Sequence, residues 1–229
     1  MNKIEKKIIA IGGVGVSPES DKELDNFIIN HSKKMKNNIG FLGTASKDDK
    51  EKINKFYKRF NNTSSELSHF NLTSDIDGFH EWLLNKDIVY VGGGNTFYML
   101  EIWKKNNLEQ VFKKAYEKGL ILSGVSAGAV CWFEWILSDS MGRGFEPLKG
   151  INLIEGSCTP HSDNIERINE FEFNIKNNKL PNGVAIDDGV AVVFIDGKPT
   201  EVYSSINNHN AYFLDKNTKI NLKEYIKNI

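Results

Sequence analysis

Short apolar runs alternate with longer amphipathic stretches from Ile8 to Val125, and this alternation limits the chain to few folds. Continuous apolar runs are typical of strands buried on both faces, whereas apolar residues at helical spacing indicate amphipathic helices. The expected strands are Ile8–Ile11, Ile39–Leu42, Glu66–Leu72, Asp87–Val91 and Gly119–Leu122, and the expected helices are Asp21–Lys36, Asp49–Phe60, Asp75–Asn85 and Asn95–Lys118. Because short connections between alternating strands and helices favour a parallel sheet with helices on both faces, the sequence predicts an α/β, doubly wound, mostly parallel sheet.

The alternation of apolar runs and amphipathic stretches stops after residue 180, where shorter apolar segments are separated by Asp-Gly turns. The segments are Val184–Ile186, Val190–Phe194 and Glu201–Tyr203. Such spacing predicts an antiparallel, hairpin-rich extension at one edge of the sheet. With 229 residues, 40% of them hydrophobic, the chain is long enough for one large domain and too short for two comfortable ones. We therefore expect a single α/β domain over residues 1–229.

Charge and cysteine content limit which binding partners and which cellular compartment are expected for this chain. The formal net charge of -1 gives no electrostatic argument for binding nucleic acid or an anionic membrane surface. Cys131 and Cys158 are too few for a disulfide framework and match no zinc-ligand spacing, so a reducing cytoplasm is the expected location. The apolar run near the N-terminus is too short for a signal-peptide core or a membrane span. The sequence leaves the oligomeric state open between a monomer and a homodimer.

The segment Gly124–Ala129, with sequence GVSAGA, follows an expected strand and places a serine where that strand turns into a helix. A nucleophilic residue at such a turn has a strained backbone conformation, and other segments of the main chain pack closely against it. Gly124 and Gly128 have no side chain, so they avoid steric clashes with these segments. The start of the following helix would also direct unpaired N–H groups toward an oxyanion formed at Ser126. The alternative is a glycine-rich structural turn whose serine caps the helix.

A second glycine-rich segment, with sequence GGGNT, ends another expected strand. The chain has neither a G-x-G-x-x-G after its first strand nor a Walker A lysine, which disfavours phosphate binding. Glycines let the backbone approach a substrate closely, so Gly93 or Gly94 is a candidate second oxyanion donor beside the N–H of Ala127. The loop could instead cap the next helix through Asn95 or Thr96, and one loop can do both.

An activated serine needs a base, and three of the five histidines fall within expected helices or a strand, where packing or a surface role is favoured. His161 lies in a loop, and loops on a rigid scaffold carry many catalytic side chains, so we prefer His161 to His209 as the base. The imidazole must be oriented by a carboxylate, which either Asp139 or Asp188 could supply. Spacing does not choose between them, and each aspartate could simply bond its own turn.

Three motifs, taken in order, give the sequence a family resemblance: VGGGNTF from Val91, GVSAGA from Gly124, and the Pro160-His161 pair. The chain resembles the peptidase E (aspartyl dipeptidase) family, whose relatives include cyanophycinase, from the first strand to about residue 190. The resemblance implies a class I glutamine-amidotransferase-like fold in which serine replaces the usual cysteine nucleophile. It also implies a serine peptidase that acts on short peptides and needs no metal or cofactor.

Carried over by motif, the resemblance makes Ser126 the nucleophile and His161 the base. It places the acidic member between these two in the sequence, beyond the elbow helix, where Asp139 fits. Asp188 and Glu134 stay as alternatives, because the family uses either Glu or Asp. The oxyanion donors that it implies are Gly93, Gly94 and Ala127.

The resemblance also implies a preference for an N-terminal aspartate, which requires a cation near the acyl side chain. Arg167 is expected on the helix after His161, whereas Arg143 lies in a glycine-flanked segment that could move over the site as a lid. We favour Arg167, with an ion pair to Glu166 or Glu170 as its alternative role. The substrate-binding candidates are Asn95, Thr96 and Arg167. Two other functions stay open, a cyanophycinase-like isopeptidase and a non-catalytic binding protein on the same scaffold.

Overall fold

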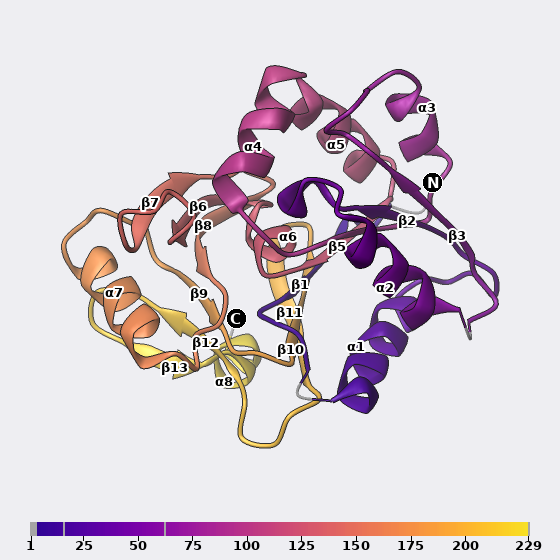
Figure 1. Cartoon of the computed structure of the whole chain (residues 1–229). Coiled ribbons are helices and arrows are strands. Elements are labelled where there is room, and N and C mark those ends of the chain that lie inside the picture. Colours follow the sequence, from indigo (N-terminus) through magenta and orange to yellow (C-terminus); the bar gives the residue numbers. More distant parts are fainter. Residues whose placement is uncertain (1–3, 16, 62, 229) are drawn as a thin grey trace.

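The computed structural model describes residues 4–15, 17–61 and 63–228, which form two β-sheets flanked by helices (Figure 1). The strands are β1 (Lys7–Ile11), β2 (Asn38–Leu42), β3 (Glu66–Phe70), β4 (Ile88–Val91), β5 (Ile121–Val125), β6 (Phe133–Ser138), β7 (Glu146–Lys149), β8 (Ile154–Thr159), β9 (Gly183–Ile186), β10 (Val190–Ile195), β11 (Lys198–Ser204), β12 (Ala211–Leu214) and β13 (Lys219–Asn221). The helices are α1 (Pro18–Asn30), α2 (Lys50–Phe60), α3 (Phe79–Leu84), α4 (Thr96–Lys105), α5 (Leu108–Glu117), α6 (Ala127–Val130), α7 (Ile165–Lys176) and α8 (Leu222–Lys227), with a short 3-10 helix, η1, at Thr44–Ser46.

The larger sheet has seven strands in the order β11-β10-β1-β5-β4-β2-β3, and β1, β5, β4, β2 and β3 run parallel. Alternate residues of β1 enter different cores: Ile9 and Ile11 pack toward α1 and α2, whereas Ile8 and Ala10 pack with α4 and α5. Figure 1 shows α1 and α2 on one side of this sheet and α3, α4 and α5 on the other. The predicted doubly wound α/β architecture is confirmed.

Several helix boundaries differ from the expected ones for local reasons. The first helix begins at Pro18, because Ser17 and Ser20 form a capping box ahead of it, and it ends at Asn30 rather than Lys36. The long helix expected up to Lys118 is two helices, α4 and α5. Asn107 between them has φ 54°, a left-handed conformation in which a right-handed helix cannot continue. The helix expected at Asp75–Asn85 is limited to α3.

The late hairpin prediction is right in part. Strands β10 and β11 form an antiparallel pair that extends the larger sheet beyond β1, joined by a tight turn in which Asp196 and Gly197 both have positive φ. Strand β9, however, leaves that sheet and pairs with β8 and β12. It belongs to a second sheet of six strands, ordered β13-β12-β9-β8-β6-β7, which the sequence did not predict.

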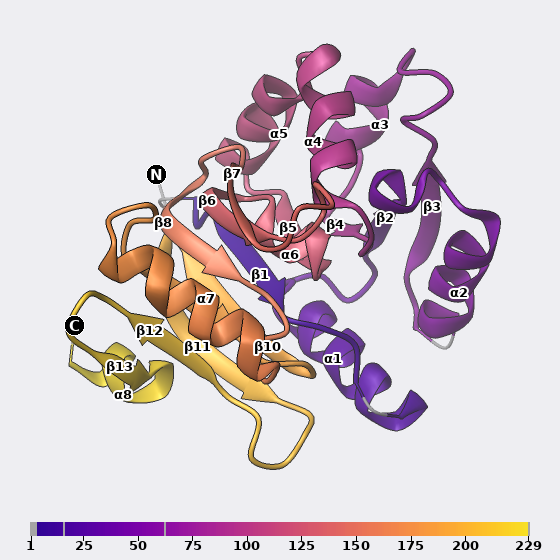
Figure 2. The same cartoon turned by 60° about the vertical axis from the view of Figure 1, so that its left-hand side comes forward.

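The second sheet carries its own helix. Helix α7 lies across it (Figure 2) and buries Ile168, Phe171 and Ile175 against Leu137 and Leu214. The loop between β8 and α7 contains His161, so this sheet determines where the imidazole lies. No helix in the part of the chain that the structure describes is long and apolar enough to cross a membrane.

Candidate active site

Ser126 stands at a sharp turn between β5 and α6, with φ 54° and ψ -114°, a strained conformation for a residue that has a side chain. The glycines beside it are required by close backbone approach. A Cβ on Gly124 would lie 2.3 Å from the Gly128 carbonyl oxygen, and one on Gly128 would lie 2.1 Å from that of Val91. The turn is therefore the strained elbow expected from the sequence, although α6 is a single four-residue turn.

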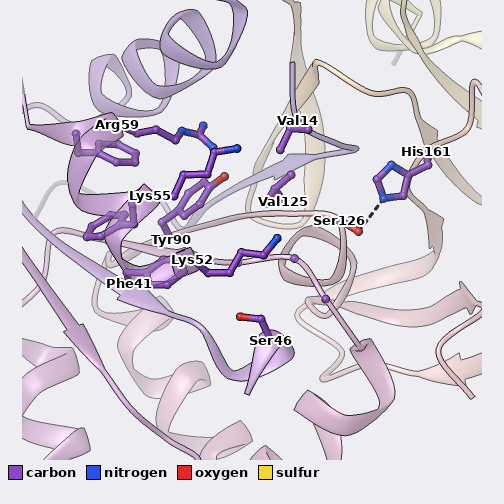
Figure 3. A pocket seen from close by; sticks show the side chains of 15 residues that line it. Val14, Phe41, Ser46, Lys52, Lys55, Arg59, Tyr90, Val125, Ser126 and His161 are labelled. Atoms are coloured by element: carbon purple, nitrogen blue, oxygen red, sulfur yellow. Dashed lines mark hydrogen bonds between the residues drawn. The ribbon is translucent and has the colours of Figure 1, made fainter. Parts of the chain in front are cut away.

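His161 reaches the serine from the loop that follows β8. Its Nε2 lies 2.8 Å from Ser126 Oγ, the interaction drawn as a dashed line in Figure 3. His161 also has a positive φ, 52°, so both members of the pair have sparsely populated backbone conformations. The structure thus brings together the two side chains that the sequence paired across a separation of 35 residues. The other candidate base, His209, bonds a backbone carbonyl instead.

The carboxylate beside His161 is that of Asp188, not Asp139. Asp188 Oδ1 lies 2.5 Å from His161 Nδ1, so Nδ1 carries the donated proton and Nε2 is free to accept one from the serine. The expectation for Asp139 is corrected here, because its carboxylate is bound 2.9 Å from an Arg167 nitrogen and its side chain is 58% exposed. Glu134, the remaining alternative, faces the Gly156 N–H.

Two side chains hold the turn that carries Asp188, and a glycine leaves space beside it. Asp163, two residues beyond the imidazole, accepts the Asp188 N–H at 3.0 Å, and His209 Nδ1 donates to the Asp188 carbonyl at 2.8 Å. Gly13, at the end of β1, leaves space for the pair: a Cβ there would lie 1.8 Å from Asp188 Oδ1 and 2.8 Å from His161 Nδ1. Sequence analysis assigned no role to Gly13 or to Asp163.

Backbone donors suited to an oxyanion lie beside the serine. A Cβ on Gly93 would be 3.3 Å from Ser126 Cβ and 3.9 Å from its Oγ, so this glycine borders the nucleophile directly. The N–H groups of Gly93 and Ala127 are bonded to no acceptor among the residues that the structure describes. Gly94 has φ 152°, and a Cβ there would lie 2.3 Å from the Ala45 carbonyl oxygen, so its backbone is fixed by contact with η1.

A cavity of about 290 Å³ opens on one side of Ser126 and His161, and it includes Thr96, Asp139 and Arg167. The Arg167 guanidinium is nearly buried and lies over the Phe145 ring, 4.6 Å from its centroid. The ion pair that was the alternative role of Arg167 exists, but its partner is Asp139 rather than Glu166 or Glu170.

Asn95 has a structural task at the edge of this cavity. Its Oδ1 caps α4 by accepting the Tyr98 N–H at 2.8 Å, and its Nδ2 donates to the Ser140 carbonyl at 2.9 Å. Asn95 therefore caps the helix, which is the alternative role that the sequence left open for it.

Arg143 is exposed and lines neither of the two cavities that contain Ser126.

A second cavity, of about 250 Å³, lies on the other side of the nucleophile between α2 and the larger sheet (Figure 3). Its lining residues are Val14, Phe41, Ser46, Lys52, Lys55, Phe56, Arg59, Phe60, Tyr90, Gly92, Gly93, Gly94, Val125, Ser126 and His161. Sequence analysis did not predict this cavity, because its walls come from six segments that are far apart along the chain, between Val14 and His161.

Neither cysteine competes with Ser126 as a nucleophile. Cys131 and Cys158 are free and fully buried, and burial raises the pKa of both thiols well above the ordinary value, so they stay protonated. No three His, Cys, Asp or Glu side chains gather into a metal-binding group within the described ranges.

Comparison with known proteins identifies a family of peptidases to which this chain is similar. The profile of "Peptidase family S51" matches residues 8–202. The chain is 38% identical over 213 residues to the uncharacterized peptidase YgaJ of Bacillus subtilis, which spans 90% of this chain and 91% of that protein. It is 24% identical over 176 residues to an uncharacterized peptidase of Listeria innocua, over 70% of this chain and 80% of that one.

Two solved structures have the same fold. A peptidase from an acI-B1 Actinobacterium superposes with a TM-score of 0.70 at 16% identity, over 96% of this chain and 95% of its own. A putative peptidase E protein from Listeria monocytogenes gives a TM-score of 0.67 at 17% identity, over 87% and 98%. The class I glutamine-amidotransferase-like fold expected from the sequence is thereby confirmed.

Proposed function

Because the chain belongs to peptidase family S51 and is a serine-type peptidase, we propose that it hydrolyses short peptides through an acyl-enzyme on Ser126. His161 is the base and Asp188 the acid that orients it. One observation carries the proposal: the unbroken chain of hydrogen bonds from Ser126 Oγ through both nitrogens of His161 to Asp188.

The reaction follows from these positions. His161 Nε2 takes the hydroxyl proton as Ser126 Oγ attacks the peptide carbonyl, and Asp188 stabilises the imidazolium that forms. The N–H groups of Gly93 and Ala127 face the resulting oxyanion. The C–N bond then breaks as His161 protonates the departing amine, and water activated by the same imidazole hydrolyses the ester.

The cavity that contains Arg167 binds the N-terminal residue of the substrate in this proposal. The buried guanidinium suits a carboxylate, and its present partner, Asp139, is exposed enough to be displaced by the side chain of an N-terminal aspartate. Thr96 lines the same cavity, and Asn95 donates a hydrogen bond to the Ser140 carbonyl at its edge. A cavity of about 290 Å³ accommodates one residue, which favours short peptides over a branched polymer.

The nucleophile is tested by Ser126→Ala. Loss of the hydroxyl is expected to lower kcat on the order of 10⁶-fold and to abolish labelling by a fluorophosphonate probe, while the melting temperature stays within a few degrees. Turnover or labelling that survives the substitution would show that the nucleophile is another residue.

Specificity is tested with Asp-X, Ala-X and Leu-X dipeptides. Arg167→Gln should raise KM for Asp-X and leave Ala-X unchanged, whereas the exposed Arg143→Gln is the matched control and should affect neither. Equal turnover of the three dipeptides by the unmodified enzyme removes the aspartate preference but not the peptidase. An Asp-X defect confined to Arg143→Gln would instead assign the cation to the glycine-flanked segment.

A further inference from the structure

The cavity between α2 and the larger sheet is not used by the mechanism above, although it begins at Ser126. Most of its walls are apolar, formed by Phe41, Phe56, Phe60 and Tyr90 with Val14 and Val125. Burial raises the pKa of Tyr90 to about 12, so its phenol adds no charge to these walls. The cavity volume of about 250 Å³ exceeds the roughly 150 Å³ that holds a benzene ring, so one large apolar side chain fits.

Three cations from one face of α2 line the same cavity: Lys52, Lys55 and Arg59. They are spaced three and four residues apart, which places them on one stripe of the helix. No Asp or Glu is among the lining residues. The cavity therefore joins an apolar interior to a positively charged wall.

The three cations differ in how far they are neutralised. Arg59 donates to both oxygens of the buried Asp25, at 2.9 and 2.5 Å. Lys55 lies 3.9 Å from an oxygen of Asp21. Lys52 forms no ion pair with any acid in the described ranges, and its side chain points across the cavity toward Ser126 in Figure 3. Of the three cations, Lys52 is therefore the one whose charge is available to bind an anionic group of a ligand.

We propose that this cavity binds the leaving residue of the substrate, as an apolar side chain with a free C-terminal carboxylate that Lys52 holds. The inference rests on the peptidase function proposed above. In a peptide, an apolar residue carries a carboxylate only when it is C-terminal, and the cavity has room for one residue. The enzyme then releases a single large apolar residue from the C-terminus, with the acyl residue in the Arg167 cavity on the other side of Ser126.

The kinetic test varies the leaving residue and keeps the best acyl residue of the dipeptide assay. A Phe leaving residue should give a kcat/KM roughly ten- to a hundred-fold above Ala, the gain expected from burying the ring. Replacing the terminal carboxylate of the Phe substrate by an amide should cost about three- to ten-fold. Lys52→Gln should remove this acid-over-amide ratio and keep the Phe-over-Ala ratio. Lys50→Gln, an equal charge change at an exposed position of α2 outside the cavity, should keep both.

A binding measurement separates this inference from the peptidase proposal, because it requires no turnover. Ser126→Ala protein is titrated with L-phenylalanine, L-phenylalaninamide and L-alanine, and binding is followed by NMR shifts of residues around the cavity. Tighter binding of L-phenylalanine than of both others, lost in a Ser126→Ala, Lys52→Gln double variant, supports the inference. Equal binding of L-phenylalanine and L-alanine, or L-phenylalanine binding that is unchanged by Lys52→Gln, overturns it. Absent dipeptide turnover and absent fluorophosphonate labelling would remove the proposed function instead.

Discussion

Replacing Asp188 by Asn is the sharpest test of the site, because the family resemblance favoured Asp139 whereas the structure places Asp188 beside His161. The carboxylate lies 2.5 Å from His161 Nδ1 and fixes the tautomer that leaves Nε2 free to accept the serine proton. An amide at this position can turn its NH₂ group toward Nδ1, which stabilises the opposite tautomer and puts a proton on Nε2. The substitution is nearly isosteric, so the turn should keep its place.

The expected size of the effect follows from burial. An aspartate-to-asparagine change in a fully buried serine-protease triad lowers kcat about 10⁴-fold, equivalent to about 5.4 kcal/mol of transition-state stabilisation. The Asp188 side chain is 33% exposed, so water can partly compensate for the lost charge. We therefore expect a loss of about 10³-fold in kcat, smaller than the loss in a fully buried triad.

Asp139→Asn is the matched control. It removes the same charge from a side chain that is 58% exposed and 2.9 Å from Arg167, so it should change KM for Asp-X by less than about ten-fold and leave kcat nearly constant. Both variants are assayed for kcat and KM on the best dipeptide and for the rate of fluorophosphonate labelling, with melting curves as the folding check. A loss in Asp139→Asn equal to that in Asp188→Asn, or an Asp188→Asn enzyme within ten-fold of the unmodified kcat, refutes the assignment.

Three further predictions concern packing, space and protonation. Gly13→Ala should lower kcat about 10²- to 10³-fold with the circular dichroism spectrum unchanged, because the new methyl would lie 1.8 Å from Asp188 Oδ1 and must displace the carboxylate. Trp103→Ala should cost about 3–5 kcal/mol in urea unfolding, since the indole is fully buried with its centroid 4.5 Å from that of Phe112. Burial lowers the pKa of His31 below the ordinary 6.5, so the unfolded chain binds the proton first, and stability falls as the pH decreases below that value. His31→Gln should flatten this acid limb of the stability profile, and an unchanged limb would contradict the reasoning.

Local patterns in the sequence were sufficient to predict the parallel strands of the larger sheet and two members of the site, Ser126 and His161. Apart from β3, the parallel strands contain short apolar runs, and the glycines around Ser126 are dictated by contacts within two residues of the turn or with the neighbouring strand end. His161 could be chosen because it lies in a loop, and loops on a rigid scaffold carry many catalytic side chains. These features depend on short stretches of chain, which is why periodicity and turn chemistry find them.

The acid could not be chosen in this way. Asp139 and Asp188 both occur in turn-like segments, and nothing local separates a carboxylate that bonds Arg167 from one that bonds His161. The choice depends on β10 running antiparallel beside β1, which carries the preceding turn to the end of the first strand. The second sheet was missed for a related reason, since pairing between β8 and β9 joins strands on either side of α7.

The end of β1 explains how a serine and an acid from different sheet regions keep a fixed separation. The Ile11 carbonyl accepts the Ser126 N–H at 2.9 Å, and the Gly13 carbonyl, two residues on, accepts the Gly189 N–H at 3.1 Å. Nucleophile and acid are thus both tied by backbone hydrogen bonds to one short stretch of strand, and Asp163 ties the imidazole loop to the same turn. A side chain at position 13 would collide with Asp188 and His161, so the glycine there decides whether the triad can form.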